Sequence, residues 1–263
     1  MTETVTMTDT AASLRGGVAV VTGASRGLGR ALVAEFLVQG MRVAGIARST
    51  GALEDLASES RGRFLPVAAD MGDADQVANG FALIARTLGA VTILVNNAAV
   101  YPRRDILDET PDSFIETINI NLGGSFHACH NALPVMTGLG FGRVVNVVTF
   151  ADRAPIPLAS AYSVSKGAQR ILTKALVADL GDRFPDIVVT DWVPGALRTS
   201  MGRPGGLRPE QAARWGVRLA LLHDRDLQGA LFVQNAQSLP PRPRKERAIQ
   251  FLLGQKPVLH RLD

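Results

Sequence analysis

Short runs of apolar, β-branched residues alternate along this chain with longer segments of helical periodicity. Residues 17–22 are the first such run, and residues 28–39 place Leu28, Leu32 and Phe36 on one helical stripe, which Gly40 ends. Alternation of this kind, with strands that are apolar throughout, predicts a parallel sheet covered by helices on both faces. The expected fold is a single-domain, doubly wound α/β sheet of about seven strands.

The same reasoning places the remaining elements. Further strands are predicted at residues 41–47, 64–69, 91–95, 144–149, 187–193 and 230–233. Helices are predicted at 51–60, 73–88, 111–137, 159–183 and 209–223, with Asp73 as an N-cap. Residues 195–209 are rich in glycine, proline and arginine and have no period, which predicts a mobile loop.

One domain is expected, since neither an internal repeat nor a linker divides the chain. We assign residues 17–239 to this domain, residues 1–16 to a polar N-terminal leader and residues 240–263 to a Pro/Arg-rich C-terminal tail. The tail has a possible short helix near 245–253.

Charge and cysteine content exclude several classes of protein. Lys and Arg total 28 against 24 Asp and Glu, which gives a net charge of +4. A charge this small does not indicate binding to nucleic acid or to a membrane surface. One cysteine, Cys129, excludes an internal disulfide and a four-cysteine zinc site. No signal peptide is evident, and no apolar stretch approaches the roughly 20 residues that span a bilayer. We therefore expect a cytoplasmic protein without a membrane or nucleic-acid partner.

A glycine-rich loop separates the first strand from the first helix. Gly23, Gly27 and Gly29 let backbone N–H groups approach a pyrophosphate, and the helix N-terminus adds positive potential. The same glycines could serve only a tight turn. Residues 23–27 also match the G-x-S-x-G pattern around a hydrolase nucleophile, here Ser25, but that pattern normally follows several strands rather than the first.

Four motifs in register resemble the short-chain dehydrogenase/reductase family. They are T-G-x-x-x-G-x-G at 22–29, N-N-A-A at 96–99, Y-x-x-x-K at 162–166 and P-G-x-x-x-T at 194–199. Their order and spacing agree over residues 17–235, nearly the whole chain. The resemblance implies a Rossmann-like fold and hydride transfer between a nicotinamide cofactor and a carbonyl or alcohol carbon.

The resemblance also assigns the catalytic roles. Tyr162 and Lys166 are four residues apart and share a helix face, where an ammonium lowers the pKa of a phenol from its usual value near 10. The family's serine, thirteen residues before the tyrosine, is replaced by Thr149, which keeps the hydroxyl. Asn121 resembles the asparagine that holds a relay water, with Asn119 as the competing position. No metal is expected.

The end of the second predicted strand bears on which nicotinamide cofactor binds. An acid there would accept hydrogen bonds from a free 2′-hydroxyl, but Ala47 occupies the position and Arg48 follows. Arg26 lies within the glycine loop. Because guanidinium groups suit a phosphate, we expect NADP(H) rather than NAD(H).

The rest of the cofactor site follows from the resemblance. Asp70 and Met71 correspond to the adenine contact, Asn96, Asn97 and Ala98 to the adenosine ribose side, and Thr199 to the carboxamide contact. The predicted set comprises Gly23, Ser25, Arg26, Gly27, Leu28, Gly29, Arg48, Asp70, Met71, Asn97, Ala98, Tyr162, Lys166, Pro194, Gly195 and Thr199.

Three further features concern metal binding, loop closure and the surroundings of the substrate. His127, Cys129 and His130 are close in sequence but do not share one helix face, which favours packing over zinc binding. Residues 195–209 are expected to close over bound substrate. Side chains expected to flank the substrate are Tyr101, Phe150, Pro155 and Ile156, and loop arginines that could select an anionic substrate are Arg103, Arg104, Arg153, Arg198, Arg203 and Arg208.

The sequence therefore predicts an NADPH-dependent reductase of a ketone or aldehyde, with Tyr162 as the general acid. One alternative is a secondary-alcohol dehydrogenase running oxidatively. Another is a catalytically silent NADP(H)-binding regulatory protein, which the missing serine suggests. The helices at 111–137 and 159–183 resemble those that pair subunits in the family, so a homodimer or homotetramer is expected.

Overall fold

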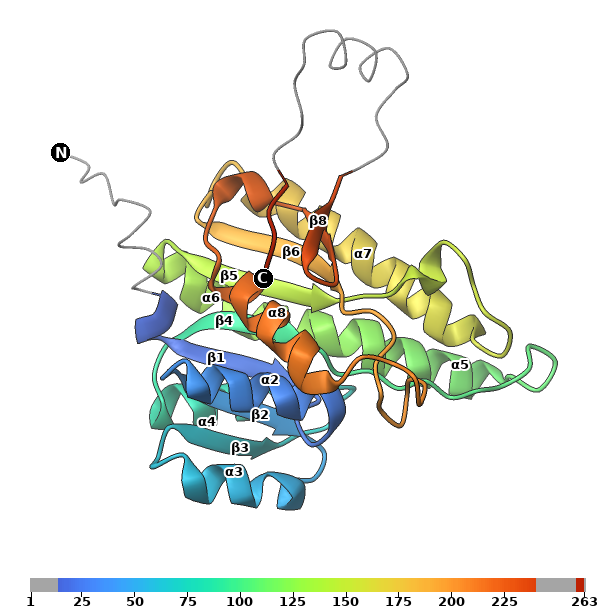
Figure 1. Cartoon of the computed structure of the whole chain (residues 1–263), viewed down its shortest axis with the longest axis horizontal. Coiled ribbons are helices and arrows are strands. Elements are labelled where there is room, and N and C mark those ends of the chain that lie inside the picture. Colours follow the sequence, from blue (N-terminus) through green and yellow to red (C-terminus); the bar gives the residue numbers. More distant parts are fainter. Residues whose placement is uncertain (1–13, 240–258, 263) are drawn as a thin grey trace, which may run out of the picture.

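One sheet organises the chain. The computed structural model describes residues 14–239 and 259–262, and within them eight strands pair in the order β3-β2-β1-β4-β5-β6-β7-β8 (Figure 1). Strands β1 to β7 are parallel, and β8 runs antiparallel to β7. The doubly wound α/β fold predicted from the sequence is confirmed, with one strand more than expected.

The strands and helices fall close to their predicted positions. The strands are β1 (Val18–Thr22), β2 (Arg42–Ala47), β3 (Phe64–Ala68), β4 (Val91–Asn96), β5 (Gly142–Val147), β6 (Ile187–Val193), β7 (Leu231–Val233) and β8 (Ala236–Ser238). The helices are α2 (Gly27–Val38), α3 (Glu54–Glu59), α4 (Ala74–Thr87), α5 (Pro111–Ile118), α6 (Gly124–Leu139), α7 (Ser160–Leu180) and α8 (Pro209–Leu221). Single turns are η1 (Gly51–Leu53), η2 (Asn119–Gly123), η3 (Phe150–Asp152) and η4 (Arg225–Leu227). Strand β8 was missed because three residues are too few to show a period.

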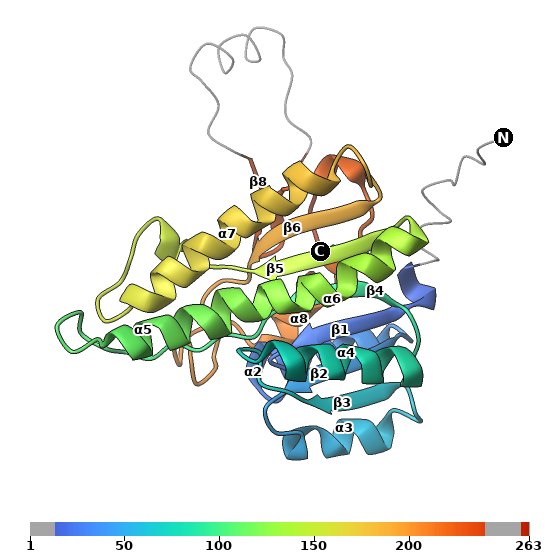
Figure 2. The same cartoon turned by 180° about the vertical axis from the view of Figure 1, so that it is seen from behind.

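Helices cover both faces of the sheet. Helices α2 and α8 pack on one face around the buried side chains of Leu32, Phe36 and Trp192 (Figure 1). Helices α4, α6 and α7 pack on the other face, around Phe81, Ile84 and other apolar residues (Figure 2). Because both faces are covered, the central strands are buried along their whole length, which explains their continuous apolar sequences.

The long helix expected at 111–137 is interrupted. Thr110 caps α5 by accepting a hydrogen bond from the Ser113 N–H at 3.2 Å, with Pro111 in the first turn. The chain then widens into a π-helical turn at η2 and continues as α6. Periodicity alone could not show this turn, since one wide turn hardly changes the apolar stripe. Turns of this kind are frequent at functional sites.

Both described ends of the chain pack against the domain. Leu14 is fully buried, and its carbonyl accepts a hydrogen bond of 2.8 Å from the Thr92 hydroxyl. Near the C-terminus, Leu262 is buried, and Arg218 donates to its carbonyl at 3.0 Å. Parts of the predicted leader and tail therefore contribute to the core. The helix predicted near 245–253 lies outside the described residues.

Packing between α2, α8 and the sheet gives a stability test. A Cβ at Gly216 would lie 2.6 Å from Trp192 Cζ3 and 2.9 Å from Leu32 Cδ2. We expect Gly216→Ala to lower the free energy of unfolding by about 1–3 kcal/mol, because the added methyl overpacks the core. Urea unfolding measures the change.

Gly138 provides the matched control, since it also lies in a helix but a Cβ there would meet nothing within 4 Å. Gly138→Ala should leave the protein as stable or raise the unfolding free energy by about 0.5–1 kcal/mol. Equal effects at the two sites would contradict this account of the packing.

Candidate active site

The functional site lies at the carboxyl edge of the parallel sheet. Loops that follow β1, β4, β5 and β6 converge there around a cavity of about 1210 Å³. The strand order reverses between β1 and β4, so the chain leaves these neighbouring strands in opposite directions and opens a crevice. Ligands of doubly wound sheets bind at this position.

The glycine loop between β1 and α2 is packed too closely for larger residues. Gly23 has φ +68°, and a Cβ there would lie 2.8 Å from the Cα of Ala98. A Cβ at Gly29 would lie 2.1 Å from the Gly23 carbonyl oxygen. The loop lines the cavity directly before the N-terminus of α2. This is the backbone arrangement that a pyrophosphate requires.

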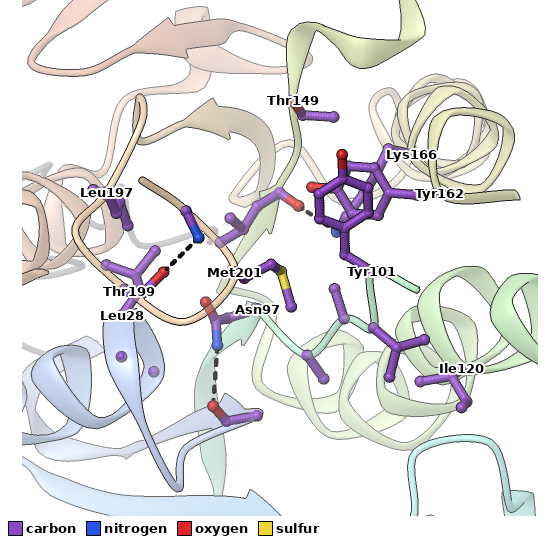
Figure 3. A pocket seen from close by; sticks show the side chains of 18 of the residues that line it. Leu28, Asn97, Tyr101, Ile120, Thr149, Tyr162, Lys166, Leu197, Thr199 and Met201 are labelled. Atoms are coloured by element: carbon purple, nitrogen blue, oxygen red, sulfur yellow. Dashed lines mark hydrogen bonds between the residues drawn. The ribbon is translucent and has the colours of Figure 1, made fainter. Parts of the chain in front are cut away.

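Two side chains join the loops on either side of the crevice. The Thr22 hydroxyl accepts the N–H groups of Asn97 and Ala98 at 3.1 and 3.0 Å. In return, Asn97 Nδ2 donates to the carbonyl oxygens of Thr22 and Gly23 at 2.9 and 3.2 Å (Figure 3). Thr22 was not among the predicted site residues. Its position in the first motif was the available signal.

All predicted cofactor-binding residues except Asn96 line this cavity. Arg26, Arg48 and Ala47 lie at its β2 end, and within residues 14–239 and 259–262 neither arginine forms an ion pair. These residues fit a cofactor that carries a phosphate at this end. Asn96 is the exception among the ribose-side positions. It is buried, and its Nδ2 donates to Asn146 Oδ1 at 2.9 Å, so it does not line the cavity.

Thr149 and Tyr162 bring two hydroxyl groups to the cavity, from the end of β5 and from α7 (Figure 3). Burial raises the pKa of Tyr162, a hydrogen bond with Thr149 opposes this rise, and the nearby Tyr101 adds to it. The sequence instead predicted a lowered pKa. The difference arises because the phenol is largely desolvated, which disfavours the phenolate.

Lys166 lies beside Tyr162 on α7, but its ammonium has other partners. Its Nζ donates to the Val147 carbonyl and to Gln169 Oε1, both at 2.8 Å. Burial lowers the pKa of Lys166 to about 8, and the negative charge of Asp191 opposes that shift. Burial also raises the pKa of Asp191 to about 6, although Thr173 donates to this carboxylate at 2.6 Å.

Asn121 lies behind the cavity wall rather than in it. Its Oδ1 accepts the Val100 N–H at 2.7 Å, and its Nδ2 donates to the Val100 carbonyl and the Ser165 hydroxyl at 3.0 and 2.9 Å. It therefore joins the loop after β4 to α7. Asn119 faces elsewhere and donates to the Gly72 carbonyl at 2.8 Å. The structure thus brings Asn121, and not Asn119, beside α7.

Buried polar side chains that the sequence reasoning missed connect these groups. Gln169 Nε2 donates to the Ser125 hydroxyl at 2.8 Å, and that hydroxyl donates to the Asn121 carbonyl at 2.9 Å. A continuous chain of hydrogen bonds therefore runs from Lys166 to the π-helical turn. The signal that could have found it is the helical spacing of Lys166, Gln169 and Thr173 on one face of α7.

The loop expected at 195–209 has its own hydrogen bonds. Arg198 donates its N–H to the Leu207 carbonyl at 2.8 Å, and Leu207 donates to the Ala196 carbonyl at 2.9 Å. Its first part, including Leu197, Thr199 and Met201, lines the cavity near the glycine loop (Figure 3). Whether it closes over substrate stays a prediction.

Several other hypotheses can be compared with the described residues. Cys129 is buried and its pKa is raised to about 12 by burial, and no group of three or more His, Cys, Asp or Glu in the described part of the chain could hold a metal ion. No described helix is long and apolar enough to cross a membrane.

Ser25 lines the cavity, but no histidine is among the lining residues. A hydrolase nucleophile would therefore lack its usual base there.

The profile of the short chain dehydrogenase family matches residues 17–207. The chain belongs to the short-chain dehydrogenase/reductase family, a family of oxidoreductases, as its motifs indicated. Among its relatives, Carbonyl reductase [NADPH] 2 of Sus scrofa is 35% identical over 197 residues, which cover 74% of this chain and 78% of that protein. The 2-(R)-hydroxypropyl-CoM dehydrogenase of Xanthobacter autotrophicus is 37% identical, with coverage of 70% and 76%.

Solved structures agree with this assignment. A metagenomic short-chain oxidoreductase in complex with NADP is 27% identical, with a TM-score of 0.70 and coverage of 80% of this chain and 93% of that one. The KRED1-Pglu enzyme is also 27% identical, with a TM-score of 0.75 and coverage of 82% and 100%. The similarity extends over the sheet and its helices rather than over isolated motifs.

The buried ammonium of Lys166 predicts a pH dependence of stability. Its pKa is about 8 in the folded chain, against 10.5 for an ordinary lysine. Between these values the unfolded chain binds more protons, so folding stability rises with pH. Relative to Lys166→Met, the wild-type protein should gain roughly 2–3 kcal/mol of unfolding free energy from pH 8 to 10.5, measured by urea unfolding.

Lys174 on the same helix is exposed and serves as the control. The stability of Lys174→Met should follow the wild-type pH curve. Parallel curves for wild type and Lys166→Met would show that Lys166 keeps an ordinary proton affinity in the folded protein.

Proposed function

We propose that this protein is an NADP(H)-dependent oxidoreductase that reduces a ketone or aldehyde to an alcohol. The observation that carries the proposal is that one cavity is lined by both the Tyr162 and Thr149 hydroxyls and the glycine loop. The relatives named as a carbonyl reductase and a dehydrogenase support the reaction class.

Three side chains have different roles at the substrate carbonyl. A bound nicotinamide would supply the hydride, which this chain's residues cannot provide. Tyr162 donates its phenolic proton to the carbonyl oxygen as negative charge develops there. The Thr149 hydroxyl holds the same oxygen. Lys166, which also lines the cavity, would provide positive charge near a bound cofactor and the phenol.

The arginines at the β2 end support NADP(H) over NAD(H). Arg26 and Arg48 line the cavity there, and residues 47–49 at the end of β2 include no acid. A phosphate would satisfy both guanidinium groups. The solved relative in complex with NADP agrees with this choice.

Two alternatives have distinct outcomes. A secondary-alcohol dehydrogenase would favour oxidation, with Tyr162 accepting rather than donating the proton. A silent regulatory protein would bind NADPH, measured by calorimetry, and turn over none of a broad carbonyl panel. Loss of NADPH absorbance with that panel separates reduction from both alternatives.

We further propose a homodimer or homotetramer in the cytoplasm. Exposed apolar side chains on α5, α6 and α7, namely Ile115, Phe126 and Ile171, are 61%, 51% and 61% exposed. Such exposure along the paired long helices is typical of a subunit interface. The cytoplasmic assignment rests on the low cysteine content.

Removal of the catalytic hydroxyls should affect turnover more than cofactor binding. We expect Tyr162→Phe to lower kcat/KM by about 10²–10⁴-fold because the proton donor is lost. Thr149→Ala should lower it by about 10²–10³-fold, since one donor to the developing oxyanion is lost. Steady-state kinetics with NADPH and a carbonyl substrate give both values.

A threonine outside the site is the control. Thr137 on α6 donates only to the Pro134 carbonyl, and Thr137→Ala should keep wild-type activity. If Thr149→Ala retained full kcat/KM while Tyr162→Phe was inactive, the role given to Thr149 would be wrong.

Cofactor choice is tested at the β2 end. Arg48→Ala should raise KM for NADPH about tenfold and change KM for NADH by no more than about twofold, because only the phosphate loses a partner. Arg86→Ala, an exposed substitution on α4, should change neither value. A preference for NADH that Arg48→Ala leaves unchanged would refute NADP(H) dependence.

A further inference from the structure

The end of the cavity that holds the reacting hydroxyls is mostly apolar. Beyond Thr149 and Tyr162, the cavity is lined by side chains from separate loops: Tyr101, Phe150, Ile156 and Met201. The Tyr101 ring lies 4.5 Å from that of Tyr162, centroid to centroid, at a tilt of 37° (Figure 3). A substrate whose carbonyl reaches Tyr162 therefore has aromatic and aliphatic neighbours around its other atoms.

The apolar surface continues outside the cavity onto its rim. The loops after β4 and β5 carry Ile106, Leu107, Ile156 and Leu158, which are 65%, 91%, 49% and 44% exposed. Exposed large apolar side chains that cluster beside a cavity are typical of a binding surface. Ile156 both lines the cavity and is exposed outside it, so it connects the lining with the exposed apolar side chains of these two loops.

The two loops are held together in a fixed arrangement. Arg104 donates its N–H to the Leu158 carbonyl at 3.2 Å, and Arg104 forms a parallel bridge with Ala159. Leu158 has φ +63°, a backbone conformation that glycine adopts far more readily than leucine. The backbone at Leu158 is therefore strained, and strain of this kind is frequent beside binding sites.

Charged groups at this end are paired, lie against aromatic rings, or carry a negative charge. Arg104 pairs with Glu109 at 3.2 Å. The guanidinium groups of Arg103 and Arg153 lie over the rings of Tyr101 and Phe150, at 5.6 and 5.9 Å. The carboxylate-bearing residue Glu116 lines the cavity. A negatively charged substrate would meet this carboxylate.

We propose that the substrate is an uncharged carbonyl compound with an apolar arm, alkyl or aryl, that passes between Tyr101, Phe150 and Ile156 and lies on the rim. This inference rests on the proposed function and names its substrate class. The carbonyl oxygen is held by Thr149 and Tyr162, and the arm takes its binding free energy from burial of apolar surface.

The test is a series of unbranched methyl ketones from butanone to dodecanone, reduced with NADPH. We expect kcat/KM to rise about fourfold with each added methylene until the arm reaches past the rim, where the rise stops. Ile156→Ser and Leu107→Ser should both flatten the later part of this series relative to the wild-type protein. Val38→Ser, at a 77% exposed valine on α2, is the matched control and should keep the wild-type slope.

Three results would overturn the substrate class. They are a flat series, a better kcat/KM for ketones of equal length that end in a carboxylate, and rim variants that keep the wild-type slope. Sedimentation of Leu107→Ser adds a further criterion. Dissociation of an oligomer without flattening would assign the rim to a second copy of the chain instead.

A binding measurement separates this proposal from the proposed function. The uncharged dye Nile red should fluoresce on binding the wild-type protein and be displaced by the longer ketones, and this response should weaken in Ile156→Ser. Displacement without turnover of any ketone would refute the reductase function and keep the apolar site. Turnover of short polar carbonyls, with no dye binding, would refute the apolar substrate class alone.

Discussion

The joint between Thr22 and Asn97 is the interaction on which the active site depends. At the reversal of strand order, the loops after β1 and β4 leave the sheet in opposite directions, and their backbone groups lose the partners that a strand ladder provides. The Thr22 hydroxyl and the Asn97 amide satisfy these groups. The crevice can therefore stay open for a ligand while its two walls keep a fixed separation.

A second constraint is the burial of polar groups beneath the reacting hydroxyls. Lys166 and Asp191 carry opposite charges in a desolvated region. Burial lowers the pKa of Lys166 and raises that of Asp191, which favours the neutral form of each. Fixed hydrogen bonds to Val147, Gln169 and Thr173 keep these groups in place. The pKa of the buried Lys166 ammonium is therefore about 8. Burial of these charges costs folding free energy, which the surrounding apolar core offsets.

Much of this arrangement could be predicted from the sequence, because the relevant signals are local. The periods of strands and helices, the glycine loop and the Y-x-x-x-K spacing each lie within a few residues. The features that the sequence did not predict are either very short or depend on contacts between distant parts of the chain. Strand β8 has only three residues, the π-helical turn of η2 leaves the apolar stripe almost unchanged, and Asn96 is buried inside the sheet although it adjoins cavity-lining Asn97. The pKa of Tyr162 is raised rather than lowered, because burial of the phenol outweighs its hydrogen bond with Thr149.

Residue type and spacing were enough to predict the doubly wound fold, the family and the candidate site residues, because they specify local conformation and chemistry. The contacts of those side chains follow from the packing of distant segments. This packing placed Tyr101 beside Tyr162, directed Lys166 toward Gln169, and separated Asn121 from Asn119. It also joined two loops into one apolar rim. These contacts connect residues far apart in the chain, and their energies depend on burial and distance, which no local pattern contains.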